Sequence, residues 1–402
     1  MSQTSTLQSL ISTPGFLALS AFRLCRSIST WIELTVIYAV MVLYFEASTA
    51  EIAVTAVWVS VPHLILTPIA GAFCDRHSPV LVMRVSALCR VVVAICMSMA
   101  STLPVFVVLM FIRSVALLGE VAEPVVNRRL LAGHKLLPAA QVAVTIEQGT
   151  KLLAPVIGST VASMAFAQSG FLIAACFCGL CVVSSVFLGS VARNWVSAST
   201  VSTKSTLLTG MRLTLTTKGA LFNVCMIYAS LCFSVGSLNP LLLILLRDNN
   251  LSRSMMGTLM LSMSIGAMLG SMSFKILFRH ASLVNVLIGS QLALCAVVAC
   301  SGLLSNFFYP YPVWLLFTLY GMTGFLFASA SVAIFAIIQT TAPVESIGAV
   351  SAVAKGLFFF FTLVAPMLST LVAQTIDAYA GLFITGLIGI LIGAVTSLRT
   401  VD

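Results

Sequence analysis

Long apolar stretches, separated by short polar or Gly/Pro-containing connectors, run along nearly the whole chain. A helix needs about 20 consecutive apolar residues to cross a bilayer. Twelve stretches reach this length and predict transmembrane helices. Their predicted bounds are 16–44, 52–73, 80–100, 104–126, 138–165, 170–189, 220–246, 255–277, 283–304, 312–337, 347–374 and 378–398. The pattern therefore predicts an all-α polytopic membrane protein.

A polar connector divides the predicted helices into six and six. Residues 190–219 contain four basic residues, many Ser and Thr, and no acidic residue. We expect a cytoplasmic N-terminal segment (1–15), an N-terminal six-helix bundle (16–189), the cytoplasmic connector (190–219), a C-terminal six-helix bundle (220–398) and a cytoplasmic tail (399–402). The first 13 residues are polar, so no cleavable signal peptide is expected.

Composition excludes several other classes of protein. Of 402 residues, 60% are hydrophobic and 8% are charged, which leaves no room for a sizeable soluble domain. In this membrane context the net charge of +9 is a topology signal, and nucleic acid is excluded as a partner. Most of the eleven cysteines lie in apolar runs without a nearby His or carboxylate, so we expect buried thiols and no metal site.

The distribution of basic residues predicts orientation. The even-numbered connectors and the helix ends at Arg23, Arg26 and Arg399 carry fourteen of the twenty Lys and Arg residues. Only Arg247 and Arg253 lie in odd-numbered connectors. By the positive-inside rule, both termini are expected on the cytoplasmic side of an inner (cytoplasmic) membrane.

The two halves resemble each other in sequence. Ala154-Pro155 and Ala365-Pro366 occupy similar positions in the fifth and eleventh predicted helices, 211 residues apart. Repeats of six helices are typical of transporters, in which two bundles rock about a site between them. Helix breaks are expected at the following residues: Pro155, Gly158, Asn239, Pro240 and Pro366.

A motif follows the second predicted helix. The sequence GAFCDRHSPVLVMR begins at Gly71 and contains Asp75-Arg76. It resembles the signature between the second and third helices of the major facilitator superfamily. Together with RSVALLGEVAEP, LLPAAQVAV and LLAPVIGS, it is similar to the branch with the enterobactin exporter and macrolide efflux proteins. The resemblance implies the major facilitator fold, two six-helix bundles, a monomer, and a cytoplasmic latch formed by Gly71, Asp75 and Arg76.

The sequence departs from that branch in the first helix. Ser29-Thr30-Trp31 stands where the branch often has Gly-Asp-Trp, so the usual acid is missing. Glu33 lies one turn further along the same face and is a candidate proton carrier. The pair Arg113 and Gly119 resembles a fourth-helix pair of proton-coupled members, although its spacing is wider.

Eight charged residues fall inside predicted helices, where each is expected to face a partner or a watery cavity. They are Glu33, Arg90, Arg113, Glu120, Glu123, Glu147, Lys151 and Lys355. Glu147 and Lys151 share a helix face, so either Glu147 exchanges a proton while Lys151 meets substrate, or the two form a permanent pair.

Among these eight residues, the four cations are candidates for substrate binding or charge pairing: Arg90, Arg113, Lys151 and Lys355. Arg113 is expected to bind an anion or to influence a nearby carboxylate, or else to bond Glu120. Arg90 and Lys355 add positive charge. Glu120 and Glu123 are expected to be mainly structural, within reach of Arg128 and Arg129.

Together these features predict a proton-coupled secondary transporter, not an enzyme, that exports a small amphipathic or anionic molecule. The resemblance makes a siderophore or a drug-like compound the expected substrate class. The chain lacks a phosphate-binding loop, so the energy source is expected to be the proton gradient, without a cofactor. Alternatives are inward transport of an iron-siderophore or other nutrient, a lipid flippase, and a non-transporting membrane sensor.

Overall fold

The computed structural model describes most of the chain. The described residues are 8–48, 51, 61–62, 64–67, 69–71, 73–74, 77–131, 133–162, 168–192, 220–248, 255–304, 312–343 and 347–401. Outside them lie most of the second predicted helix (52–73), residues 193–219 of the connector, Asp75 and Arg76.

The described chain is helical and its helices agree closely with the predicted spans. The N-terminal half contains α2 (Phe16–Leu43), α4 (Pro79–Ser98), α5 (Leu103–Leu117), the 3-10 helix η1 (Leu118–Val121), α6 (Ala122–Leu130), α7 (Gly133–Ala162) and α8 (Ser169–Ala192). The C-terminal half contains α10 (Ala220–Asp248), α11 (Met255–Leu277), α12 (Leu283–Leu303), α13 (Val313–Thr341), α14 (Ile347–Thr375) and α15 (Ala378–Val401).

Local sequence explains where several helices begin. The Ser78 hydroxyl accepts a hydrogen bond from the Leu81 N–H and Pro79 occupies the first turn of α4. Ser282 caps α12 in the same way, through the Asn285 N–H. Gly15, with a φ of 85°, precedes α2 in the left-handed region that glycine tolerates.

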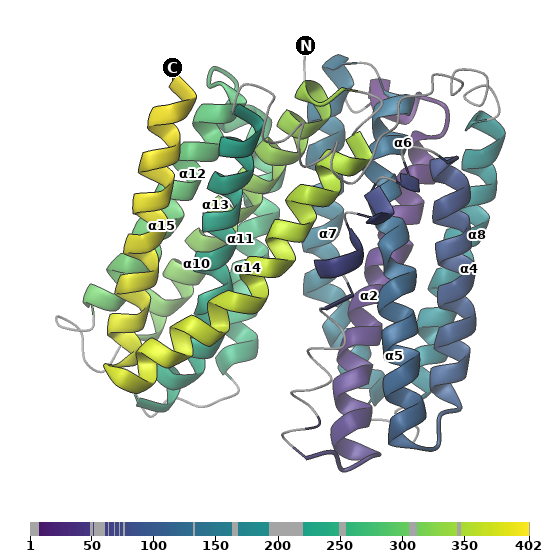
Figure 1. Ribbon diagram of the computed structural model, residues 1–402, viewed down its shortest axis with the longest axis horizontal. Helices are drawn as coiled ribbons and strands as arrows, with labels where there is room; N and C mark the ends of the chain where they lie inside the picture. The colour runs from purple at the N-terminus through teal and green to yellow at the C-terminus, as the bar shows by residue number, and fades with distance from the viewer. Residues whose placement is uncertain are drawn as a thin grey trace. The chain divides into compact units, whose positions relative to one another are not determined.

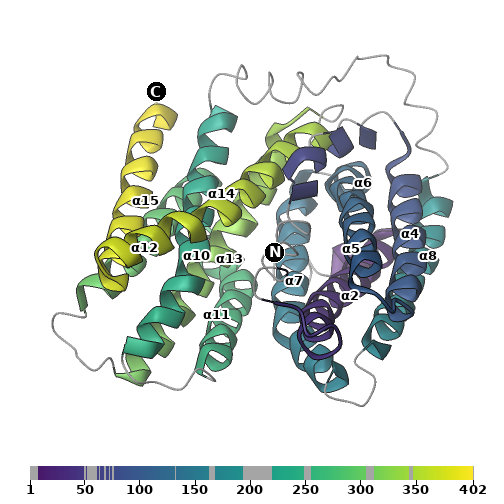
Figure 2. The same cartoon turned by 60° about the horizontal axis from the view of Figure 1, so that its bottom comes forward.

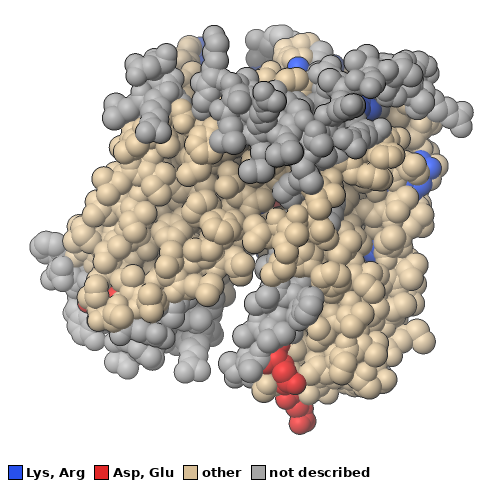
Figure 3. Space-filling model, viewed as in Figure 1, with Lys and Arg blue, Asp and Glu red and all other residues tan. Residues whose placement is uncertain are grey.

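The described helices have the lengths and surfaces of membrane spans. Ten of them are long and apolar enough to cross a bilayer. Figure 3 shows one face of the molecule, on which few Lys, Arg, Asp and Glu atoms are visible among the described residues. The chain is therefore a multi-pass membrane protein, as its hydrophobic pattern predicts.

The chain forms two compact units. Unit 1 comprises residues 1–139, 149–211 and 342–356, and unit 2 comprises residues 140–148, 212–341 and 357–402. Two helices are divided between the units: α7 contributes its residues 140–148 to unit 2, and α14 contributes its first turns to unit 1.

In unit 1, helix α8 packs against both α2 and α4, and Figures 1 and 2 show α4 and α8 side by side. Towards the C-terminal end of α2 the core is apolar, with Ile37 and Met41 packed near Phe106 of α5 and Phe171 of α8. The two aromatic rings lie edge to face with their centroids 5.8 Å apart. This apolar layer lies beside the charged side chains described below.

In unit 2, α15 packs against α10 and α12, and α11 packs against α13. The α11–α13 crossing depends on glycine, because a Cβ atom at Gly266 or Gly324 would overlap the backbone of the facing helix. Small residues of this kind let membrane helices approach closely.

Two predictions about helix geometry need correction. The fourth span does not run as one α-helix, because η1 interrupts it between α5 and α6. By contrast, α7, α10 and α14 are continuous through Pro155, Gly158, Asn239, Pro240 and Pro366, where breaks were expected. A proline removes one backbone hydrogen bond, yet within a membrane bundle the neighbouring groups can compensate and the helix continues.

Candidate functional site

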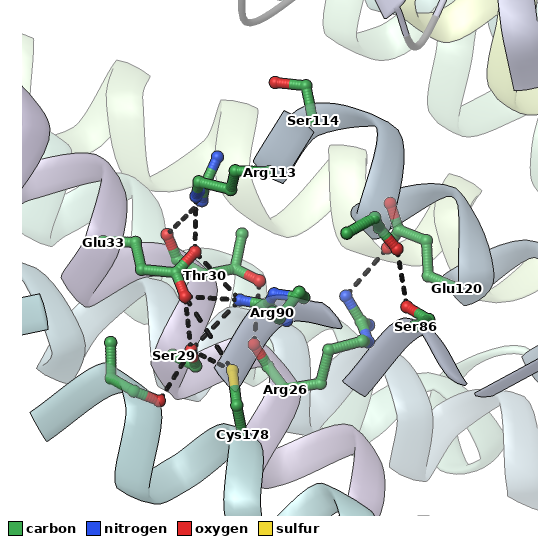
Figure 4. Close-up of polar contacts among 12 residues, drawn as sticks. Arg26, Ser29, Thr30, Glu33, Ser86, Arg90, Arg113, Ser114, Glu120 and Cys178 are labelled. Atoms are coloured by element: carbon green, nitrogen blue, oxygen red, sulfur yellow. Dashed lines mark hydrogen bonds and ion pairs between the residues drawn. The ribbon is translucent and has the colours of Figure 1, made fainter. Parts of the chain in front are cut away.

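A buried carboxylate shared by two arginines lies in the middle of unit 1 (Figure 4). Arg90 of α4 donates through Nη2 to both carboxylate oxygens of Glu33, at 3.1 and 3.0 Å. Arg113 of α5 donates through Nε to one of the same oxygens. The three residues are 1–3% exposed. We call Glu33, Arg90 and Arg113 the central triad.

Polar side chains from α2 and α8 complete the surroundings of the triad. The Ser29 hydroxyl, one turn before Glu33, donates to the Glu33 carboxylate at 2.9 Å and accepts from Arg90 at 3.0 Å. The Cys178 sulfur lies 3.0 Å from the Ser29 oxygen. Arg113 also donates to the Thr30 carbonyl oxygen at 3.4 Å. The Glu33 carboxylate is therefore fixed from three helices besides its own.

The triad carries an excess of positive charge far from the helix ends. Two guanidinium groups and one carboxylate give a net charge of +1 (2 − 1). Glu33 lies 17 residues after the start of α2 and 10 before its end. A charge at such a depth costs on the order of 3 kcal/mol or more, so a further negative group, such as a bound anion, would be stabilised there.

A second ion-pair network, the lower network, lies nearer the N-terminal end of α2. Glu123 accepts from Arg23 at 3.0 Å and from Arg26 at 2.5 Å. Glu120 pairs with Arg26 at 2.8 Å and with Lys355 at 3.5 Å. Three cations face two carboxylates, so this network also has a net charge of +1 (3 − 2).

These pairings correct two expectations and agree with one of the two options for Arg113. Arg23 and Arg26 were counted as helix-end charges, but both lie inside α2 and are buried or partly buried. They, rather than Arg128 and Arg129, are the arginines bonded to Glu120 and Glu123. Arg113 pairs with Glu33, which is the nearby carboxylate that it was expected to influence, whereas Glu120, the alternative partner, lies within η1 and pairs with Arg26 and Lys355.

Glu147 and Lys151, the expected pair on α7, belong to different units, and each has contacts within its own unit. The Lys151 ammonium lies 5.6 Å above the Trp31 ring centroid, a cation–π contact. Glu147 is half-buried and lies within electrostatic range of the Tyr228 hydroxyl. On the same helix, Thr145 donates to the Ser271 hydroxyl at 3.0 Å. The proton-carrying role of Glu147 stays a prediction.

Of the expected latch, only Gly71 is among the described residues. A Cβ atom at Gly71 would press against Gly348 and Ala352 of α14. Gly71 thus permits a close approach to the first turns of α14, the same segment that carries Lys355. The latch itself stays a prediction.

Sequence reasoning missed a neutral cluster in unit 2. Gln291 of α12 is fully buried and donates to the Ser230 hydroxyl at 3.0 Å and to the Gly389 carbonyl oxygen at 2.7 Å. Ser230 belongs to α10 and Gly389 to α15, so one amide joins three helices. The signal that could have found this cluster is Gln291 itself, a glutamine midway along a mainly apolar span.

The fold matches solved transporter structures. One match is a bacterial homologue of the iron transporter ferroportin in the outward-facing state, with 18% identity and a TM-score of 0.78. The match covers 96% of this chain and 99% of that homologue. The structure of that homologue with soaked iron gives 17% identity, 95% and 98% coverage, and a TM-score of 0.74. For the human organic anion transporter MFSD10 (TETRAN), the identity is 11%, the coverage 94% and 98%, and the TM-score 0.77.

The similarity to these structures extends over nearly the whole chain, so the chain has the major facilitator fold. The expectation of this fold is confirmed. No family model and no curated protein matches the sequence. At these identities the similarity establishes the fold, and the charged site of unit 1 has to supply the argument for function.

Proposed function

We propose that this protein is a secondary active transporter that exports a small amphipathic or anionic molecule, of siderophore or drug-like type, by alternating access. The observation that carries the proposal is the sharing of Glu33 by Arg90 and Arg113, which leaves one positive charge in excess within a transporter fold. An anion binding beside this triad would offset the charge. A metal cation would be repelled by the same arginines.

A second face of α2 fits a substrate that is partly aromatic or apolar. Trp31 and Tyr38 lie two turns apart on a face of α2 directed away from the buried Glu33, and Tyr38 is 37% exposed. Lys151 stands over the Trp31 ring. Rings and ammonium together would contact the apolar and charged parts of an amphipathic anion.

Arg113 supplies a mechanism for coupling. A substrate anion that takes the Arg113 guanidinium removes one partner from Glu33, and a carboxylate with fewer partners in the membrane gains from taking up a proton. When the proton leaves, Glu33 returns to Arg113 and displaces the anion. For export, the membrane potential assists, because it drives a monoanion outward by about 2.3 kcal/mol per 100 mV in a cell with a negative interior. Glu147 is the proposed second proton carrier, which returns a proton inward.

One observation favours the alternative of inward transport. In the exchange at Glu33, proton uptake and anion binding promote each other, so proton and anion travel in the same direction if Glu33 is the sole carrier. That linkage is the basis of symport. An inward-directed proton gradient would then drive uptake of an anionic nutrient or an iron-siderophore.

A metabolite comparison tests both directions. Small molecules are measured inside cells and in the medium, with and without the gene, under iron-limited and iron-replete growth. Export predicts a compound that accumulates inside and falls in the medium when the gene is absent, and iron dependence would indicate a siderophore. Accumulation in the medium with depletion inside would reverse the direction. No difference under either condition would argue against a siderophore or nutrient as substrate and would leave drug efflux or a role without transport.

The identified compound then allows a test of coupling in proteoliposomes with a pH-sensitive dye. Co-transport of protons with the compound supports symport, and proton movement in the opposite direction supports proton-coupled export. The Glu33→Gln variant is expected to transport without proton movement or not at all. Unchanged proton coupling in this variant would exclude Glu33 as a carrier.

A further inference from the structure

A small cavity lies between the central triad and the lower network of unit 1. Its lining includes Arg90 and Cys178 from the surroundings of the triad, Arg26 and Glu120 from the lower network, and Ser86 and Ala87 from α4. The cavity has room for about one water molecule or one small ion. It therefore stands where two positively charged groups of side chains meet.

Arg90 contributes an unsatisfied donor to this lining. Its side chain is 3% exposed, and all three of its hydrogen bonds to Ser29 and Glu33 are made through Nη2. The Nε atom has no hydrogen-bond partner among the described residues. A buried donor without a partner costs about 1–3 kcal/mol, more when it belongs to a charged group. A ligand that accepts a hydrogen bond from Nε would remove this cost.

The charges around the cavity favour a negative ligand. Among the described residues, the triad and the lower network together contain five cations and three carboxylates, a net charge of +2 (5 − 3). Glu120 is the carboxylate in the lining, and it is already paired with Arg26 and Lys355. Water could accept from Arg90 but would leave the excess charge in place. A monovalent anion would satisfy the donor and offset part of the charge.

We propose that this cavity binds a small inorganic monoanion, chloride under cellular conditions. The anion accepts from Arg90 Nε and lies near the Arg26 guanidinium. Its site is separate from the face of α2 with Trp31 and Tyr38, and the proposal does not depend on the direction or the substrate of transport. The ion would stabilise the packing of α2, α4 and α8 by offsetting charge that these helices bury together.

The test uses the full chain purified in detergent, with chloride replacing gluconate at constant pH and ionic strength. Saturating chloride is expected to raise Tm by about 2–4 °C, because a ligand of the folded state stabilises it by mass action. Bromide should act similarly. Ala87→Val, which fills the cavity without altering a charge, should remove the shift, and the matched substitution Ala94→Val on the same helix should retain it.

Arg90→Lys keeps the charge but removes Nε, so it is expected to raise the chloride concentration required for half of the shift by about tenfold or more. Equal Tm values in chloride and gluconate would overturn the proposal, and so would a chloride shift that persists in Ala87→Val. A second measurement does not depend on the variants folding. Crystals grown with bromide should give an anomalous peak beside Arg90, and the absence of a peak there would indicate a water site instead.

Discussion

Helices α2, α4 and α8 of unit 1 meet around charged side chains, whereas α10, α12 and α15 of unit 2 meet around neutral ones. In unit 1, Glu33 is shared by Arg90 and Arg113. In unit 2, the Gln291 amide joins the Ser230 hydroxyl and the Gly389 carbonyl. Both centres are buried; α8 packs against α2 and α4, and α15 packs against α10 and α12.

The comparison separates packing from function. Unit 2 demonstrates that this arrangement of helices can be held by neutral hydrogen bonds and close glycine contacts. Buried ion pairs are often no more stabilising than neutral residues of similar size, because desolvation of the charges offsets their attraction. Packing alone therefore does not require the charges of unit 1, which supports a role for the central triad in binding and coupling.

The largest difference between variants of the two centres is expected in transport. Glu33→Gln should reduce proton-driven transport of the compound found by the metabolite comparison by about 100-fold or more, because glutamine cannot take up and release a proton. Gln291→Leu is the matched substitution in unit 2 and should leave transport within about twofold of wild type. Equal losses in both variants, at matched membrane expression, would abolish the functional distinction between the two centres.

The next largest effect is expected in the free energy of unfolding when the charged centre of unit 1 is altered. Glu33→Gln leaves two buried guanidinium groups with a net charge of +2 in place of +1, so we expect a loss of about 3–5 kcal/mol in the free energy of unfolding. The double variant Glu33→Gln/Arg113→Gln returns the net charge to +1 and should recover most of this loss. Thermal unfolding of the purified variants measures both. A double variant no more stable than the single one would mean that charge balance does not determine the stability of this centre.

A smaller effect is expected in unit 2. Gln291→Leu removes the donors to Ser230 and Gly389 and should cost about 1–3 kcal/mol, the range for leaving buried polar groups without partners. Thermal unfolding is measured for this variant and for Gln291→Glu. Glutamate keeps the shape of the glutamine side chain and lacks its amide donors, so the second variant separates the loss of hydrogen bonds from a change of shape. If the leucine variant is as stable as wild type, the amide does not hold these three helices together.

The smallest effect is expected at the edge of the lower network. Lys355 lies 3.5 Å from Glu120, and the two side chains are 24% and 16% exposed. Partly exposed pairs of this length contribute less than about 1 kcal/mol, so Lys355→Met should lower Tm only slightly. A loss as large as that of Glu33→Gln would place Lys355 among the groups on which unit 1 depends.

Sequence reasoning predicted the helices of this fold well, because hydrophobic length is a direct requirement of the bilayer. It also identified Glu33, Arg90 and Arg113 as buried charges. Their convergence on one carboxylate was not predictable, since it depends on which faces of three distant helices meet. Arg23 and Arg26 were assigned to a helix end because basic residues near a membrane surface usually reach water. Their acidic partners, Glu120 and Glu123, lie on segments about 100 positions later.

The same separation along the chain has a consequence for synthesis. Glu33 lies 57 and 80 residues before Arg90 and Arg113, and Arg26 lies 97 residues before Glu123. At about 5–20 residues per second, α2 emerges from the ribosome several seconds before these partners exist. During that interval a helix with two arginines and a glutamate has to remain beside the insertion machinery or in contact with water. The order of translation thus leaves α2 without the partners of its charges until α4, α5 and α6 have been made.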